Sequence, residues 1–235
     1  MKERNKKEAL ILTPVCLICV LAVSIFGLFV IKDAYSEVGL KDDGFRNLTQ
    51  VKVHSLDKSG MGVVIGVEEE YIDILTTKHL TDASAVAEAE FGNGGYAEGY
   101  MVYFYPEHDA AVLRIKREDS DLDFKGSKKA EVLSKSEYEK LSLSQKVYYL
   151  SDQTDTGKKF KTGKWLEGRT FIYEIQEEVG LFEGEVIPGM SGEGLFDEND
   201  RMVGMIIAAS DKEGAVTPAY ILESEYLKWR MNEGE

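Results

Sequence analysis

From residue 50 onward, short apolar runs follow one another with charged or turn-forming residues between them. The runs, rich in β-branched and aromatic residues, are 51–54, 61–67, 71–75, 100–105, 110–115, 147–150, 170–173 and 202–208. Runs of this length, bounded by turn signals, are typical of antiparallel sandwiches and barrels. Helical patterns do not alternate with them, which argues against a parallel α/β sheet. The sequence therefore predicts a mainly β fold.

The strand signals weaken in one place, between residues 117 and 145, where charged residues dominate. We therefore expect two β units, a first one at about 50–120 and a second at about 146–235, with a connector at 121–145. The second unit is expected to end in a helix at 223–231, where Tyr226, Leu227 and Trp229 could pack on the core.

The N-terminal part of the chain is different, because residues 9–31 contain no charged residue. About 20 apolar residues cross a bilayer as a helix. A cleaved signal peptide is the alternative, but its apolar region is usually about 7–15 residues long and precedes a small-x-small cleavage site. We therefore expect a cytoplasmic tail at 1–8, a single transmembrane helix at 9–31 and a juxtamembrane linker at 32–49.

The charge distribution indicates how this anchor is oriented. Four basic residues precede the apolar run and only Lys32 closely follows it, so the N-terminus is expected in the cytoplasm and the β units outside the cell membrane. The whole chain carries a formal net charge of −14 despite this basic N-terminus. Such an acidic surface repels phosphate backbones, and nucleic acid is not an expected partner.

Cysteine chemistry is not expected in the β units. The two cysteines, Cys16 and Cys19, both lie in the apolar N-terminal run. The remainder of the chain therefore has neither a thiol nucleophile nor a disulfide, and a core built from about 200 residues can be stable without one.

A candidate nucleophile lies in the stretch from Gly189 to Asp197, where Ser191 stands between Gly189-Met190 and Gly192. A serine on a tight glycine turn can have backbone N–H groups close to its hydroxyl. Such N–H groups stabilise the oxyanion of a tetrahedral intermediate. We therefore interpret Ser191 as a nucleophile that requires a base.

The three histidines, His54, His79 and His108, all precede Ser191. The α/β-hydrolase order, with the histidine last, is therefore excluded. His79 follows an apolar strand and Asp109 begins another, so they are the candidate base and its orienting carboxylate. Each alone is an ordinary surface or core residue, and His54 and His108 keep that interpretation. The histidines form no HExxH pair, and no metal or cofactor is expected.

These motifs resemble those of the chymotrypsin-like (PA clan) serine proteases, most closely the bacterial trypsin-like, HtrA-type branch, here without a PDZ domain. The similarity covers about residues 50–225. The matching segments are Leu75-Thr76-Thr77-Lys78-His79, the strand that Asp109 opens, Gly189 to Asp197, and Val203-Gly204.

The resemblance implies two antiparallel six-stranded β-barrels with the site between them. His79 and Asp109 would come from the first barrel and Ser191 from the second. The backbone N–H groups of Gly189 and Ser191 would form the oxyanion hole. The strand after Gly204 would pair with the extended backbone of a polypeptide substrate; its residues are Met205, Ile206, Ile207 and Ala208.

The sequence departs from the family pattern around the nucleophile. Met190 replaces the usual Asp or Asn, so it cannot form an ion pair with a freed N-terminus. Glu193 and Gly194 replace the usual Gly-Pro or Gly-Gly. Whether Glu193 faces the cleft or solvent cannot be deduced from the sequence.

Glu185 lies six residues before Ser191, where trypsin-type enzymes have the floor of the specificity pocket. This alignment would imply cleavage after Lys or Arg. However, Glu185 belongs to an acid-rich stretch, interpreted as a solvated loop region, which also contains Glu177, Glu178 and Glu183. The solvated interpretation of Glu185 is therefore preferred over the pocket floor.

Together, these features predict a membrane-anchored trypsin-like serine endopeptidase that hydrolyses peptide bonds through a His79–Asp109–Ser191 triad and an acyl-enzyme. The alternative is a catalytically weak module at the cell surface, which keeps the protease fold for binding or sensing. The unusual Met190 and Glu193 are the reason for considering it.

Overall fold

The structure is a computed structural model, and it describes residues 49–81, 84–91, 95–119, 128–154, 157–210 and 212–233. The predicted cytoplasmic tail and transmembrane helix, and the linker up to residue 48, lie outside the described residues. Within the described part, no helix combines the length and the apolar character that a membrane crossing requires.

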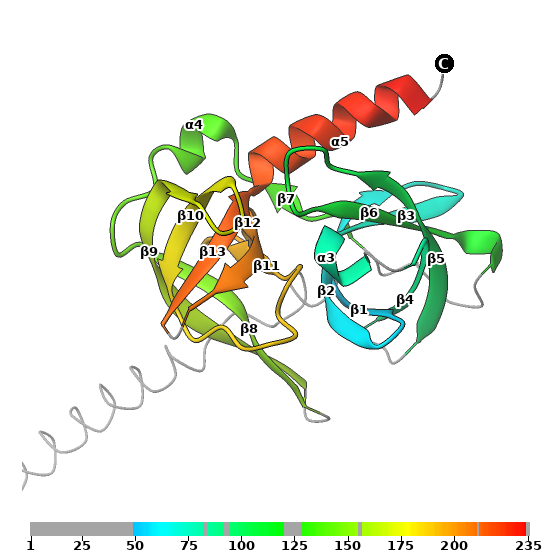
Figure 1. Cartoon of the computed structure of the whole chain (residues 1–235), viewed down its shortest axis with the longest axis horizontal. Helices are drawn as coiled ribbons and strands as arrows, with labels where there is room; N and C mark the ends of the chain where they lie inside the picture. Colours follow the sequence, from blue (N-terminus) through cyan, green and yellow to red (C-terminus); the bar gives the residue numbers. More distant parts are fainter. Residues whose placement is uncertain are drawn as a thin grey trace, which may run out of the picture. The chain divides into compact units, whose positions relative to one another are not determined.

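The first β unit is a closed antiparallel barrel with the strand order β1-β2-β3-β6-β5-β4 (Figure 1). Its strands are β1 (Gln50–Ser55), β2 (Lys58–Val67), β3 (Tyr71–Thr76), β4 (Val86–Glu90), β5 (Tyr96–Phe104) and β6 (Ala111–Lys116). Alternate residues point inward, as the period of two requires. Val51 and Val53 on β1 and Ile72 and Ile74 on β3 are at most 1% exposed.

The second β unit is a ring of six strands in the order β11-β8-β9-β10-β13-β12, closed by the pairing of β11 with β12. Its strands are β8 (Lys146–Thr154), β9 (Gly157–Ile172), β10 (Glu177–Glu183), β11 (Gly194–Phe196), β12 (Arg201–Ala209) and β13 (Glu213–Pro218). The connector adds β7 (Glu131–Val132), which pairs in parallel with β12. The predicted mainly β fold with two six-stranded barrels is thus confirmed.

Several strands were not predicted from the sequence. In β4 the inward residues are only Ala87 and Ala89, too small to produce a strong apolar signal. The acid-rich stretch that begins at Glu177 was interpreted as a loop region, and this was wrong, because residues 177–183 form β10. The alternation there is hidden by glutamates, most of which face solvent.

The described part also contains three short helices and one long one. The short ones are α3 (Lys78–Thr81), the 3-10 helix η1 (Arg117–Asp119) and α4 (Lys135–Tyr138), and the long one is α5 (Ala219–Glu233). Helix α4 begins with a capping box in which Ser134 and Glu137 satisfy each other's backbone N–H groups. The predicted C-terminal helix is confirmed, and it starts earlier than expected, directly after Pro218.

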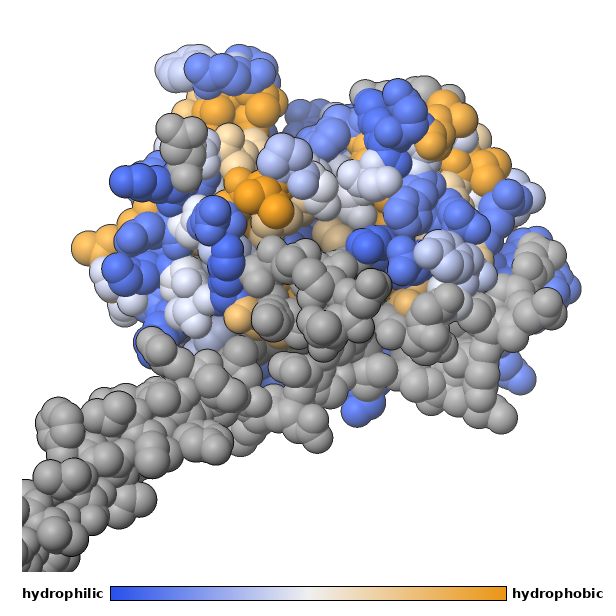
Figure 2. Space-filling view, turned by 90° about the horizontal axis from the view of Figure 1, so that it is seen from below, coloured by the Kyte–Doolittle hydropathy of each residue, from blue (hydrophilic) through white to orange (hydrophobic). Residues whose placement is uncertain are grey.

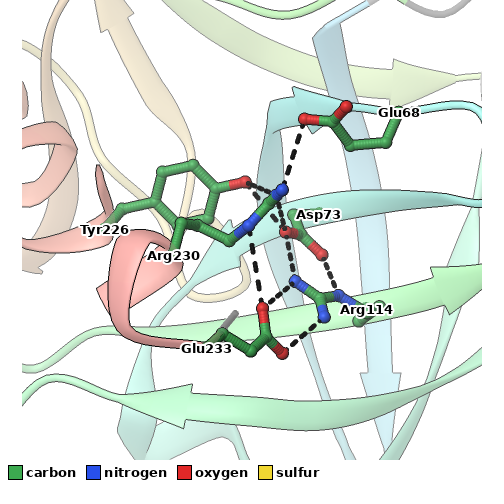
Figure 3. A network of polar contacts seen from close by, with 6 residues as sticks. All are labelled: Glu68, Asp73, Arg114, Tyr226, Arg230 and Glu233. Carbon is green, nitrogen blue, oxygen red and sulfur yellow. Dashed lines mark hydrogen bonds and ion pairs between the residues drawn. The ribbon is translucent and has the colours of Figure 1, made fainter. Parts of the chain in front are cut away.

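Helix α5 follows the second barrel in the chain, contacts its strands β12 and β13, and also reaches the first barrel (Figures 1 and 3). The fully buried carboxylate of Asp73 on β3 accepts hydrogen bonds from Arg114 on β6, at 2.7 and 2.9 Å, and from the Tyr226 hydroxyl at 2.8 Å. Arg230 approaches Asp73 at 3.3 Å, and Glu233 pairs with Arg114 at 2.6 Å. Since every buried charge has a partner, the network fastens α5 to the first barrel.

The barrels also share an apolar cluster, which includes Val63 and Leu75 from the first and Phe196 and Met205 from the second. The Gln50 side chain accepts a hydrogen bond from the Gly194 N–H at 3.0 Å across this junction. On the face seen in Figure 2, hydrophilic side chains alternate with small hydrophobic patches. The shared apolar cluster and the hydrogen bond between Gln50 and Gly194 hold the residues at the rim of this junction in defined positions.

Candidate active site

His79 and Asp109 meet because they flank two neighbouring strands. Thr76, at the end of β3, pairs with Ala111, at the start of β6. His79 lies three residues after the first and Asp109 two residues before the second. Asp109 Oδ1 accepts the His79 backbone N–H at 2.9 Å, and Oδ2 lies 2.5 Å from His79 Nδ1. The structure thus brings the predicted base and carboxylate together.

The environment keeps Asp109 ionised at neutral pH. Burial by itself would raise its pKa, but the hydrogen bonds from His79 and the positive charges of His79 and Lys78 outweigh this effect and hold the pKa below its usual value. An ionised carboxylate can only accept a hydrogen bond, so the proton between the two side chains belongs on Nδ1 of His79. Nε2 is then the nitrogen that can take up a proton.

The turn that carries Ser191 is pressed against β2. The carbonyl oxygen of Ser191 accepts the Met61 N–H at 2.8 Å. A Cβ on Gly60 would lie 2.8 Å from this oxygen and 3.0 Å from a methyl group of Leu80, the residue that follows His79. Gly60 is therefore wedged between the serine turn and α3, and the close approach of Ser191 to the His79 segment requires a glycine there.

The turn before Ser191 has the features of a type II turn. The Met190 N–H donates to the Ile187 carbonyl at 3.2 Å, and Gly189 has φ = +95°. Pro188 cannot adopt a positive φ, so of the four common turn types only type II fits. This turn type sets the plane of the Pro188–Gly189 peptide and therefore the direction of the Gly189 N–H.

Met190 and Glu193, the two unusual neighbours of the serine, both face the interior. Met190 is 6% exposed and packs in the core of the second barrel, and its sulfur accepts the Ile187 N–H. Glu193 is 1% exposed, and its carboxylate accepts the Leu150 N–H. The direction of the Glu193 side chain, which the sequence left undetermined, is therefore inward, and the carboxylate points to neither cleft nor solvent. Apolar burial holds the turn where trypsin-type enzymes use an ion pair.

The strand expected to bind substrate is β12, but its residues are not equally available. Met205 pairs with Gly194 on β11 and with Thr217 on β13. Ile206 also has its N–H and carbonyl occupied, by Glu193 and Gly192. Beyond this point β11 has ended, and Ala208 pairs among the described strands only with β13. The available edge of β12 therefore starts after Ile206.

Glu185 does not lie at the floor of a pocket. Its side chain is 69% exposed and pairs with Lys161 at 2.8 Å, and this hydrogen bond holds the Glu185 pKa below its usual value. Glu178 and Glu183 are also about half exposed and pair with basic residues of β9. These observations favour the solvated interpretation for all three glutamates.

His108 and Glu177 were assigned no role from the sequence, and for Glu177 the interpretation was wrong. His108 was interpreted as an ordinary surface or core residue; its side chain is only 14% exposed and lies 2.9 Å from Glu177. Glu177 was interpreted as a solvated acid, but it is 4% exposed. His54, whose side chain is 32% exposed, bonds to Ser59 and Glu90.

The two-barrel fold and the His79–Asp109 pair beside a serine turn are characteristic of trypsin-like serine endopeptidases. A family model, the trypsin-like peptidase domain, matches residues 60–205, well over half of the chain. The chain therefore belongs to this family and is a serine endopeptidase. No curated protein matches the sequence.

Several solved structures have a similar fold. Rv3671c from M. tuberculosis H37Rv, a mutant in an inactive form, has a TM-score of 0.58 at 19% identity, with 78% of this chain and 87% of that chain covered. The HtrA-type protease AlgW with a decapeptide has a TM-score of 0.65 at 16% identity, covering 82% and 67%. A serine endoprotease from Yersinia pestis has a TM-score of 0.58 at 16% identity, covering 80% and 65%. At these identities the similarity concerns the fold.

Proposed function

We propose that the chain cleaves polypeptides through a triad of His79, Asp109 and Ser191 and a covalent acyl-enzyme. The observation that carries this proposal is the double hydrogen bond between His79 and Asp109, next to a serine turn that is bonded to β2. The family requires a nucleophile and a base near the barrel junction, and no other serine of the chain lies on a glycine turn bonded to this strand in the described part.

In the proposed mechanism, Nε2 of His79 takes the hydroxyl proton of Ser191 while the oxygen attacks the peptide carbonyl. Asp109 keeps the imidazole in the correct tautomer and stabilises the imidazolium. His79 then donates the proton to the leaving amine, which frees the new N-terminus and leaves the acyl group on Ser191. A water molecule, activated by His79, hydrolyses this ester and restores the serine.

The oxyanion of each tetrahedral intermediate would be bound by the backbone N–H groups of Gly189 and Ser191. The type II turn at Pro188–Gly189 and the buried Met190 support this assignment, since they hold the turn without an ion pair. Preorganised donors of this kind contribute roughly 3–4 kcal/mol each to transition-state stabilisation. The inward positions of Met190 and Glu193 also argue against the alternative of a catalytically weak module.

The substrate would be an extended polypeptide that adds to the edge of β12 after Ile206. The membrane is the second proposed partner. The uncharged residues 9–31 would anchor the chain as a single helix, with the N-terminus in the cytoplasm and the protease barrels outside the cell.

The test is covalent labelling of the full-length chain, purified in mild detergent, with a fluorophosphonate probe. The parent protein should be labelled, and Ser191→Ala should abolish the labelling. Ser142→Ala is the matched control, because Ser142 is exposed between α4 and β8 and should be silent. Full labelling of Ser191→Ala would refute the assignment of the nucleophile.

The membrane proposal has its own test, because it is independent of the chemistry. Cells that express the full-length chain should retain it in the membrane fraction after washing with high salt and carbonate. External protease should remove the barrels from intact cells. Release of the chain into the soluble fraction would contradict the anchor.

A further inference from the structure

A second buried carboxylate lies directly behind the His79–Asp109 pair. Glu177 is the first residue of β10, in the second barrel, and is only 4% exposed. A buried carboxylate is costly unless hydrogen-bond donors surround it. The identity of those donors therefore indicates what the residue does.

Three donors from two segments converge on Glu177. The hydroxyl of Thr217, on β13, donates to Oε1 at 2.6 Å. His108 Nδ1 lies 2.9 Å from the same oxygen. The backbone N–H of Asp109 donates to Oε2 at 3.3 Å. The carboxylate thus joins the second barrel to two consecutive residues of the first, one of which is the proposed triad carboxylate.

The loop that Glu177 contacts is short and closed at its base. Residues 105–110 connect β5 to β6, and the Tyr105 N–H donates to the Ala110 carbonyl at 3.0 Å. Glu177 then holds the loop at His108 and Asp109. Because the two ends of the loop are bonded to each other and Glu177 binds its middle, the backbone of Asp109 has little freedom to shift relative to the second barrel.

Fixing this backbone matters because both carboxylate oxygens of Asp109 bind His79. A shift of Asp109 would therefore be passed to the imidazole. His79 and Asp109 belong to the first barrel and Ser191 to the second, so the distance between base and nucleophile depends on how the barrels are joined. Glu177 links the two barrels at the backbone N–H of Asp109.

The charges around the site make an ionised Glu177 tolerable beside Asp109. His108 faces Glu177 on one side and Glu225 of α5 at 3.6 Å on the other. The hydrogen bond to Glu177 raises the pKa of His108; burial opposes this effect, while the charges of Glu177, Glu225 and Glu107 reinforce it. A protonated His108 compensates the negative charge of Glu177.

We propose that Glu177 is a positioning residue, which holds the Asp109 segment from the opposite barrel and so aligns His79 with Ser191. This inference rests on the proposed triad. It predicts that removing the negative charge of Glu177 disturbs the His79–Asp109 bond while the barrels stay folded, since the Asp73 network and the shared core also join them.

The experiment compares Glu177→Gln with Glu225→Gln in the full-length chain in mild detergent. Both changes remove one negative charge next to His108, but only Glu177 bonds to the Asp109 backbone. The first readout is the downfield proton resonance of His79 Nδ1–H, which reports the bond to Asp109 and does not require turnover. The second is the rate of fluorophosphonate labelling, and far-UV circular dichroism verifies the fold.

In Glu177→Gln, the downfield resonance should move upfield or broaden, and labelling should slow about tenfold, as expected for a base displaced by a fraction of an ångström. In Glu225→Gln, the resonance should not move and labelling should stay within about twofold of the parent, because partly exposed charge pairs contribute little. A folded Glu177→Gln protein with an unmoved resonance and the parent's labelling rate would overturn the positioning role.

A third variant covers the case in which Glu177→Gln does not fold. Thr217→Val keeps the side-chain shape and every charge but removes the hydroxyl that orients Glu177. It should move the resonance in the same direction by a smaller amount, and an unmoved resonance would overturn the proposal. If the parent is not labelled at all, the proposed function fails, whereas the resonance still reports whether Glu177 positions Asp109.

Discussion

Replacing Asp109 by asparagine tests the proposed mechanism at its most sensitive point. The change keeps the size of the side chain, and an asparagine oxygen can still accept the His79 backbone N–H, now bonded to Oδ1 at 2.9 Å. The amide nitrogen then takes the place of Oδ2, which lies 2.5 Å from His79 Nδ1. An amide nitrogen can only donate, so Nδ1 must become the acceptor.

The consequence is a change of tautomer. With Nδ1 as acceptor, the ring proton of a neutral His79 moves to Nε2, and that nitrogen can no longer take the proton of Ser191. The loss of the negative charge also removes the stabilisation of the imidazolium. Where a triad aspartate has been changed in this way, the rate falls about 10⁴-fold, which corresponds to about 5.5 kcal/mol of transition-state stabilisation.

The assay is the second-order rate of fluorophosphonate labelling of the full-length chain, with thermal unfolding to verify the fold. Asp57→Asn is the matched control, because Asp57 is exposed in the turn between β1 and β2 and should be silent. A folded Asp109→Asn protein labelled within about tenfold of the parent rate would refute the assigned role, since the tautomer argument requires a far larger loss.

Three further predictions concern the structure around the site. Met190→Ala should lower the free energy of unfolding by about 2–5 kcal/mol because it opens a cavity in the second barrel, whereas Met190→Leu should cost less than about 1.5 kcal/mol; urea titration distinguishes them, and equal costs would contradict the packing argument. Tyr226→Phe should cost about 1–3 kcal/mol in the same assay, because it removes a donor from the buried Asp73 carboxylate, and an unchanged midpoint would contradict this. The bond to Glu177 raises the pKa of His108 in the folded protein above its usual value of 6.5. The stability that this bond contributes is therefore complete below the pKa of unfolded His108 and is lost as the pH rises through the pKa of folded His108. Unfolding midpoints at several pH values should show this loss in the parent and not in His108→Gln.

The missed residues show where sequence patterns lose information. Glu177 lies among glutamates that face solvent, and a strand period of two does not tell which member of an acidic run points inward. His108 precedes Asp109 in a polar loop, and its sequence did not tell a surface position from a buried one. Its burial results from β10 and α5, which lie about 70 or more residues further along the chain. No local pattern contains such a contact.

The sequence by itself determined the class of fold and the candidate triad. Short alternating runs can bury their apolar faces only in antiparallel sheets, and the order of His79, Asp109 and Ser191 left few known arrangements. The tertiary structure alone decided what surrounds the serine. Met190 and Glu193 could have faced the cleft, but both point into the protein. Met190 packs in the apolar core of the second barrel, and the Glu193 carboxylate accepts the Leu150 N–H. The same is true of Glu177, whose partners come from segments that only the packing of the two barrels brings together.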